Sequence, residues 1–213
     1  MSSWNEIYTQ KGIVQKSVMP VVYKFVMGLS GRAKPFVLDS GCGTGRHSMF
    51  VLDSLNDVHV EAIDASEKAV SIFKRNVVGK NCIARVCDLN QGLDYPEGFF
   101  DGVISTLVVE HGYKGDVRKW CGDMDKVLKP GGLIAFAVPS TLDPRYLTGK
   151  EVEPGTRIDT QQEDGNLPHH FFGEGEVESL FTNYSVRYKN LQSRNSDTAK
   201  VIAKHWEYLL QKP

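Results

Sequence analysis

Three alternating glycines that follow a short apolar run could form a ligand-binding turn. Residues 36–38 read Phe-Val-Leu, and this run predicts a buried strand because turn-forming residues bound it. Gly41, Gly43 and Gly45 come next, and the apolar spacing of residues 48–55 predicts a helix. Glycines let a ligand approach the backbone closely, and the first turn of a helix offers free N–H groups. This strand, turn and helix predict a nucleotide-type site at the carboxyl end of a first parallel strand.

The spacing of the glycines limits which ligand could bind there. A dinucleotide-binding fingerprint would place its third glycine at position 46, where this chain has Arg46. Asp39 also precedes the first glycine by two residues, and its carboxylate would repel a pyrophosphate but attract an ammonium group. The turn favours a ligand that carries an amino group and no phosphate, and a glycine turn that binds nothing is the alternative.

The pattern Asp39-x-Gly41-x-Gly43-x-Gly45 resembles motif I of the class I S-adenosylmethionine (SAM)-dependent methyltransferases. A second similarity is the run Val-Leu-Lys-Pro-Gly-Gly-Leu at residues 127–133, which resembles the turn before the fifth strand of these enzymes. Residues 153–172 and the ending His-Trp-Glu-Tyr at 205–208 resemble small methyltransferases of the tellurite-resistance and thiopurine types. This resemblance covers nearly the whole chain. It is specific for SAM binding and says little about the methyl acceptor.

Asp64 is the candidate that would bind the ribose of the cofactor. It ends a predicted strand at residues 58–63, and an acid at the end of a second strand can accept hydrogen bonds from both ribose hydroxyls. The alternative is that Asp64 caps the next helix, although Ser66 can already do so.

The resemblance implies the remaining cofactor contacts. In these enzymes an acid after the third strand holds the adenine amino group and an apolar neighbour packs on the ring, and Asp88 and Leu89 match those positions. A turn or helix-capping acid is the alternative for Asp88. The expected cofactor-binding residues are Asp39, Gly41, Cys42, Gly43, Thr44, Gly45, Asp64, Ala65, Asp88, Leu89, Thr106 and His111.

Two histidines are candidates for a general base. The sulfonium methyl is already electrophilic, so a thiol needs only deprotonation, whereas an amine or hydroxyl acceptor could need a base. His111 follows the fourth predicted strand and His170 lies in a long polar segment, and histidine titrates near neutrality. The alternatives are that His111 packs on the adenine or caps a helix, and that His170 anchors its loop. Adjacent His169 and His170 do not predict a metal site, because no third ligand has a recognisable spacing.

The elements that position these residues alternate between strand and helix as far as about residue 138. Such alternation predicts right-handed crossovers and a parallel sheet. With two later strands, the resemblance implies a Rossmann-like, doubly wound, seven-stranded and mostly parallel α/β sheet with an antiparallel carboxyl-terminal edge strand. The predicted strands are residues 36–38, 58–63, 81–86, 99–105, 133–138, 184–191 and 204–210, and the predicted helices include 3–11, 14–29, 48–55, 114–128 and 173–181.

The chain of 213 residues fits a single domain covering 1–213. Within it, residues 1–30 are expected to be leading helices that cap the cleft or, alternatively, pack on a sheet face. Residues 140–172, whose first part to 168 is polar and rich in proline and glycine, are expected to be an inserted lid loop, because such long loops are usually functional or disordered.

Composition excludes several classes of partner. The net charge is −1, which gives no electrostatic case for nucleic acid or an anionic membrane, and no apolar run approaches the length of a membrane span. The amino terminus does not resemble a signal peptide, and the four cysteines form no C-x-x-C pair. We therefore expect a cytoplasmic protein with reduced thiols, a monomer or homodimer.

Three functions remain compatible with the sequence. The first is a SAM-dependent methyltransferase acting on a small molecule. The second acts on a protein or nucleic acid, but the Asn/Asp-Pro-Pro-aromatic motif of many amino-methylating enzymes is replaced by Ser-Thr-Leu-Val at 105–108. The third is a catalytically silent SAM-binding protein, which would have no open cavity beside the sulfonium. A nicotinamide-dependent dehydrogenase is disfavoured by the glycine spacing.

Overall fold

The computed structural model describes residues 3–14, 16–159, 167–195 and 202–213. Its central feature is a seven-stranded sheet with the order β3-β2-β1-β4-β5-β10-β9. The strands are β1 Phe36–Ser40, β2 His59–Asp64, β3 Cys82–Val86, β4 Phe100–Thr106, β5 Leu128–Pro139, β9 Ser185–Asn195 and β10 Ile202–Gln211.

The first five strands of this sheet are parallel, and the last two form an antiparallel hairpin at its edge. Neighbouring strands from β3 to β5 pair in parallel, whereas β10 pairs antiparallel with both β5 and β9. The predicted Rossmann-like, mostly parallel sheet with an antiparallel carboxyl-terminal edge is confirmed. Within the hairpin, the strand that runs against its neighbours is β10, and β9 forms the outer position.

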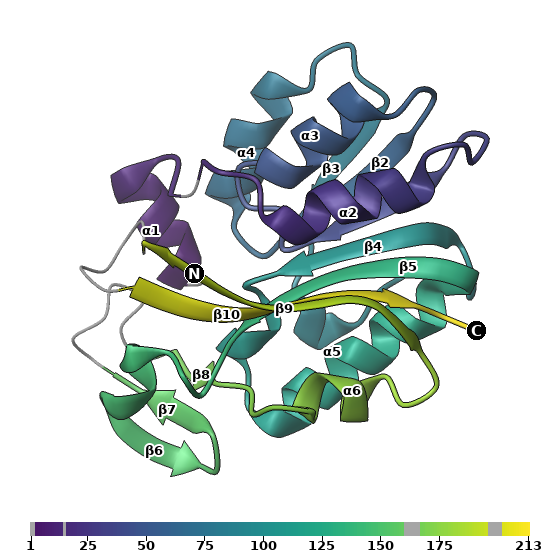
Figure 1. Ribbon diagram of the computed structural model, residues 1–213. Coiled ribbons are helices and arrows are strands. Elements are labelled where there is room, and N and C mark those ends of the chain that lie inside the picture. Colours follow the sequence, from purple (N-terminus) through teal and green to yellow (C-terminus); the bar gives the residue numbers. More distant parts are fainter. Residues whose placement is uncertain (1–2, 15, 160–166, 196–201) are drawn as a thin grey trace.

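Helices cover both faces of the sheet, as in a doubly wound fold. Figure 1 shows α2, α3 and α4 on one face and α5 and α6 on the other. The helices are α1 Ser3–Lys11, α2 Pro20–Leu29, α3 Arg46–Ser54, α4 Glu67–Asn76, α5 Lys114–Val127 and α6 Glu176–Leu180, with short 3-10 turns η1 Leu89–Gln91, η2 Val109–His111 and η3 Pro144–Leu147.

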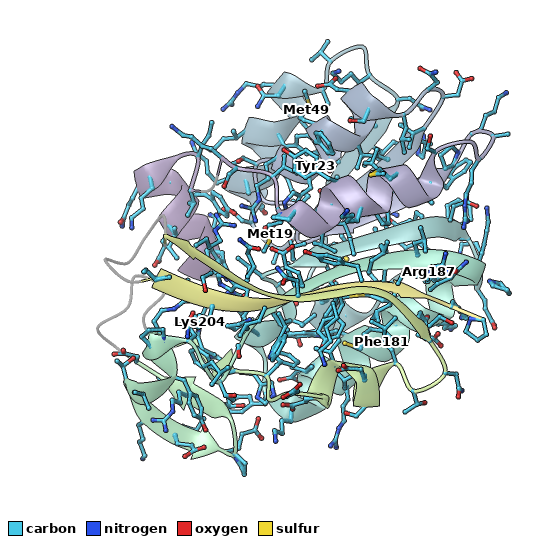
Figure 2. The ribbon with its side chains drawn as sticks, viewed as in Figure 1. Met19, Tyr23, Met49, Phe181, Arg187 and Lys204 are labelled. Carbon is cyan, nitrogen blue, oxygen red and sulfur yellow. The ribbon has the colours of Figure 1, made fainter. Side chains whose placement is uncertain are left out.

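Each face of the sheet has its own apolar core. Met19 and Phe25 from the α2 region pack with Val51 of α3 and Phe73 of α4 on one face. Aromatic residues of α5, the α6 region and β10 fill the opposite core, and Phe181 is one of them. Figure 2 places Met19 and Phe181 on opposite sides of the sheet. Burial from both faces explains why the central strands read as continuous apolar runs rather than alternating ones.

Helix α2 is shorter than the sequence predicted. The prediction began at residue 14, but the helix begins at Pro20, which occupies its first turn. Proline suits that position because its missing N–H would be unsatisfied there anyway. Proline therefore sets the start of this helix and does not kink a longer one.

The prediction of a continuous loop at residues 140–168 was wrong in part. Strands β6 Lys150–Glu153 and β7 Thr156–Ile158 form an antiparallel hairpin, and β8 His169–His170 pairs with β7. These strands are short and polar, so they lack the apolar alternation that identifies a strand in a sequence. Residues 160–166 of the expected lid lie outside the described residues. Figure 1 shows this small sheet at the same end of the molecule as α1.

Candidate active site

The carboxyl ends of β1, β2 and β4 open into a pocket of about 240 Å³. All of the expected cofactor contacts line this pocket except Asp39 and Gly45. The lining also includes side chains that the sequence did not single out as site residues, among them His47, Leu107, Val108 and Leu167. The fold therefore brings together residues from the ends of neighbouring strands, as parallel α/β sheets do.

Gly41 is a position in the glycine turn where only glycine fits. Its φ is +72°, in the left-handed region that favours glycine. A Cβ built on Gly41 would lie 2.2 Å from Cγ2 of Val108, which follows β4. Both the backbone conformation and the close approach of Val108 therefore require glycine here. This contact joins the end of β1 to the end of β4 at the floor of the pocket.

Asp39 and Gly45 contact the helices that pack beside the glycine turn. The Asp39 carboxylate is buried and accepts hydrogen bonds from the backbone N–H and the hydroxyl of Ser48, at 3.1 and 2.6 Å. Burial raises the pKa of Asp39 from 3.8 to about 6. Gly45 lies so close to the ring of Phe73 that a Cβ would come within 2.0 Å of it. Neither residue lines the pocket: Asp39 bonds α3 through Ser48, and Gly45 packs against α4 through Phe73.

Asp64 links the glycine turn to the start of α4. Its Oδ2 accepts from the backbone N–H of Gly43 and its Oδ1 from that of Ser66, each at 2.8 Å. Burial raises the pKa of Asp64 despite these two bonds. Ser66 caps α4 by accepting from the N–H of Ala69 at 3.2 Å. Because a carboxylate has about four lone-pair sites, two stay available toward the pocket after both backbone bonds are made.

Residues 87–90 form the wall of the pocket beyond β3. The side chain of Asp88 caps η1 by accepting from the N–H of Asn90 at 2.9 Å. Leu89 is half-buried and packs against the α5 side of the core. Asp88 thus performs the capping function that the sequence left as an alternative, while it also lines the pocket.

The end of β4 carries the most strained backbone of the site. Leu107 has a φ of +57°, which a residue with a side chain adopts at a cost of about 1–3 kcal/mol. Its N–H still donates to the carbonyl of Ala137 on β5 at 2.8 Å. Thr106, Leu107 and Val108 all line the pocket. The bend at Leu107 therefore lets three consecutive residues at the end of β4 contribute to the pocket wall.

His47 is a buried pocket residue that sequence reasoning missed. It is the second residue of α3, and its ring lies between the backbone N–H of Met19 and the hydroxyl of Thr106. Burial lowers the pKa of His47 well below its usual value. Its position directly after the glycine turn was the available signal, but a histidine in the first turn of a helix has no distinctive spacing.

Helix α1 lies over the pocket and contributes two aromatic side chains to its lining, Trp4 and Tyr8. Trp4 meets the ring of His111 edge to face, with 4.8 Å between the ring centroids. The Tyr8 hydroxyl lies close to the glycine turn, because a Cβ atom built on Gly43 would be 2.6 Å from that hydroxyl. Helix α2 instead packs on the sheet. The sequence left two roles open for the leading segment, capping the cleft or packing on a sheet face. Helix α1 has the first position and helix α2 has the second.

The small sheet contacts the same end of the pocket. Strand β8 places His169 against His111, with their rings edge to face and 4.8 Å between centroids. Leu167, two residues earlier, lines the pocket itself. His111 is therefore held between Trp4 of α1 and His169 of β8, at the junction of both covering segments.

His170 does not line the pocket. It is 1% exposed, with Nδ1 2.8 Å from the Thr156 hydroxyl and Nε2 2.9 Å from Oε1 of Glu176. Thr156 in turn donates to Oε1 of Glu153, which also accepts from the N–H of Lys114 at the start of α5. Both ring nitrogens are thus engaged: Nδ1 bonds within the small sheet and Nε2 joins that sheet to α6, while Glu153 makes the link to α5. This geometry favours the alternative that His170 anchors its loop, and we do not retain it as a candidate base.

Comparison with known proteins places residues 37–132 in a methyltransferase domain family. The chain is 27% identical over 153 residues to the tRNA N(3)-cytidine methyltransferase METTL2 of Mus musculus, covering 68% of this chain and 39% of that protein. The class is decided by the match of residues 37–132 to the methyltransferase domain family, together with the glycine turn and the sheet order. The chain contains a class I, SAM-dependent methyltransferase domain.

Solved structures of methyltransferases share the fold of this domain. TehB of Haemophilus influenzae superposes with a TM-score of 0.71 and 16% identity, over 99% of this chain and 67% of TehB. The 1,6-didemethyltoxoflavin-N1-methyltransferase of Burkholderia thailandensis, solved with its substrate and S-adenosylhomocysteine (SAH), gives a TM-score of 0.64 and 18% identity, over 97% of this chain and 81% of that one. The cofactor of the domain is SAM, as the resemblance implied. The chain spans less than half the length of the tRNA methyltransferase that it matches.

Two further observations concern partners. Over the described ranges, no helix combines the length and the apolar character needed to cross a membrane. Within those same residues, no three histidine, cysteine or acidic side chains gather in a way that could hold a metal ion.

Proposed function

We propose that this protein transfers the methyl group of SAM to a small-molecule acceptor. The observation that supports a small acceptor is the covering of the pocket by the chain itself. Helix α1 covers it with Trp4 and Tyr8, Leu167 before β8 lines it, and His169 of β8 packs on His111. A nucleotide within a large RNA or a side chain of a folded protein would have to displace one of these segments to reach the pocket.

The cofactor fits the residues present. Asp64 has lone pairs available for the ribose hydroxyls, and Asp88 and Leu89 stand one strand further out, where the adenine would lie. Gly41 and Gly43 line the pocket and have no side chains of their own, so a ligand can approach their backbone closely. The acceptor would then lie between the end of β4, α1 and the lid segment 140–172.

The bound cofactor supplies an electrophilic methyl group, and the chain supplies alignment and exclusion of water. Trp4, Leu107 and Leu167 give the far end of the pocket apolar walls. His111 is the candidate base for an amine or hydroxyl acceptor, since it lines the pocket and is held from two sides. An acceptor that is already an anion would not need it.

The second candidate is a macromolecular acceptor, which the similarity to a tRNA methyltransferase favours. Because this chain spans only 39% of that relative, the similarity does not extend to the remainder of that protein. The net charge of −1 gives no general attraction to RNA. A monomer or homodimer in the cytoplasm is what we expect for a small-molecule enzyme of this composition.

One labelling experiment separates the two candidates. The purified protein is incubated with SAM tritiated in the methyl group, either with a panel of thiols, chalcogen oxyanions, amines and phenols or with a whole cell extract. Label is then counted in acid-soluble products and in acid-precipitated RNA and protein. We expect protein-dependent label in the soluble fraction, and the Asp64→Ala variant as control should give much less of it when SAM is kept well below saturation. Label confined to the precipitate would contradict the proposal.

A further inference from the structure

The ring of His47 has a defined protonation pattern because of its two partners. The backbone N–H of Met19 points at Nε2 from 3.4 Å, and a backbone amide can only donate. Nε2 must therefore be the nitrogen without a proton. The ring is 4% exposed, and burial, with Arg46 and Arg194 adding to it, lowers its pKa well below the usual value, so the ring is neutral. A neutral ring that accepts at Nε2 carries its proton on Nδ1.

This tautomer fixes the direction of the next hydrogen bond. His47 Nδ1 lies 3.1 Å from Oγ1 of Thr106, so the ring donates and the hydroxyl oxygen accepts. The hydroxyl proton of Thr106 must then point elsewhere, since a hydroxyl carries only one. Within the described ranges, His47 is the one hydrogen-bond partner of that hydroxyl. Thr106 is 6% exposed and lines the pocket, so a buried, oriented donor faces the ligand space.

The order of the strands identifies what part of the cofactor lies beside Thr106. Asp88 follows β3, Asp64 ends β2, the glycine turn follows β1 and Thr106 ends β4, and these strands are neighbours in that order. With adenine at β3 and ribose at β2, the amino-acid end of the cofactor reaches β4. That end has a carboxylate, which accepts hydrogen bonds, and an ammonium group, which only donates. A fixed hydroxyl proton complements the carboxylate, whereas the ammonium would leave it unsatisfied.

We propose that Thr106 donates a hydrogen bond to the carboxylate at the amino-acid end of SAM, and that His47 is the positioning residue that orients this donor. Arg46 lines the same pocket and adds positive charge beside the site. The chain of donors from Met19 through His47 to Thr106 polarises each bond toward the anion. This inference rests on the use of SAM and is independent of which acceptor is methylated.

The test compares two ligands that differ only by the amino-acid end. SAH contains the carboxylate, and 5′-methylthioadenosine keeps the adenosine and sulfur but lacks it. In calorimetric titrations, Thr106→Val should weaken SAH binding roughly ten- to hundredfold, the range expected for a hydrogen bond to a charged group. It should leave 5′-methylthioadenosine binding within about twofold, and Thr106→Ser should behave as the native chain does. A Thr106→Val variant that weakens both ligands equally, or neither, would overturn the proposal.

His47 is tested through its dependence on Thr106. His47→Leu should selectively weaken SAH, and His47→Asn, which retains a donor near the Nδ1 position, should recover part of the loss. Because His47 acts only through the hydroxyl, the double variant His47→Leu/Thr106→Val should bind SAH no more weakly than Thr106→Val alone. Additive losses would refute the positioning role. If His47→Leu does not fold, nitrogen NMR of the native ring decides: a proton on Nε2 at neutral pH would refute the relay.

Discussion

The backbone N–H of Gly43 donates a hydrogen bond of 2.8 Å to Oδ2 of Asp64. This bond joins the glycine turn after β1 to the last residue of β2, and the other carboxylate oxygen joins β2 to α4 through Ser66. Asp64 therefore shapes the glycine turn and also lines the pocket itself. A substitution here has two effects, and experiments must separate them.

Asp64→Ala should weaken the binding of SAH roughly ten- to hundredfold without unfolding the domain, because charged hydrogen bonds to the ribose hydroxyls are lost. Calorimetric titration measures the affinity and circular dichroism checks the fold. An SAH analogue lacking both ribose hydroxyls separates the two effects. If Asp64 binds the ribose, the substitution should weaken this analogue much less than SAH, and equal losses would leave Asp64 with only its role in the turn.

Gly41→Ala should destabilise the domain and impair SAM binding, because the new Cβ meets Val108 at 2.2 Å and the φ of +72° is unfavourable for alanine. Gly31→Ala is the matched control, since Gly31 has a φ of +90° but nothing lies within 4 Å of its Cβ position. We expect the control to cost about 1–2 kcal/mol in urea unfolding and Gly41→Ala to cost more. Val108→Ala in the same chain should recover part of the difference. Equal costs for the two alanine variants would show that the contact with Val108 is unimportant.

Asp39 should make stability depend on pH in a defined direction. Burial raises its pKa from 3.8 to about 6, so the folded state holds this proton more tightly than the unfolded state does. The stability that Asp39 contributes is thus present below about pH 4 and is lost as the pH rises to about 6, a loss of about 3 kcal/mol. Asp39→Asn cannot ionise and avoids the loss. Its free energy of unfolding relative to the native chain should therefore rise across this interval, and urea titrations giving a constant difference would contradict the assignment.

His170 should hold the small sheet against the main domain. His170→Phe keeps a ring of similar size but removes the bonds to Thr156 and Glu176, so hydrogen exchange at residues 156–158 should accelerate, with a loss of about 1.5–3 kcal/mol in local stability. His59→Phe is the control, because His59 also bonds two side chains but lies on β2. It should leave exchange in the small sheet unchanged. Unaltered exchange in His170→Phe would remove the anchoring role.

The glycine spacing, the apolar runs and Pro130-Gly131-Gly132 predicted the alternating strands and helices of the main sheet, and the class of cofactor came from the resemblance of the glycine turn to a known family motif. These signals are local: a buried strand, a glycine turn and a helix start are each specified by neighbouring residues. The same local information placed Asp64 and Asp88 at strand ends, since the carboxyl ends of parallel strands must share one edge.

Tertiary structure decided everything that depends on contacts between distant residues. Local spacing carried no signal that His47 would meet Thr106, 59 residues away, or that β8 would bring His169 to His111. Asp39 and His170 are chemically suited to a site, yet packing turned both away from the pocket and engaged them in structural bonds. The direction in which a polar side chain points depends on the strand pleat and on the elements packed against it. The order of residue types along the chain does not specify those packing contacts.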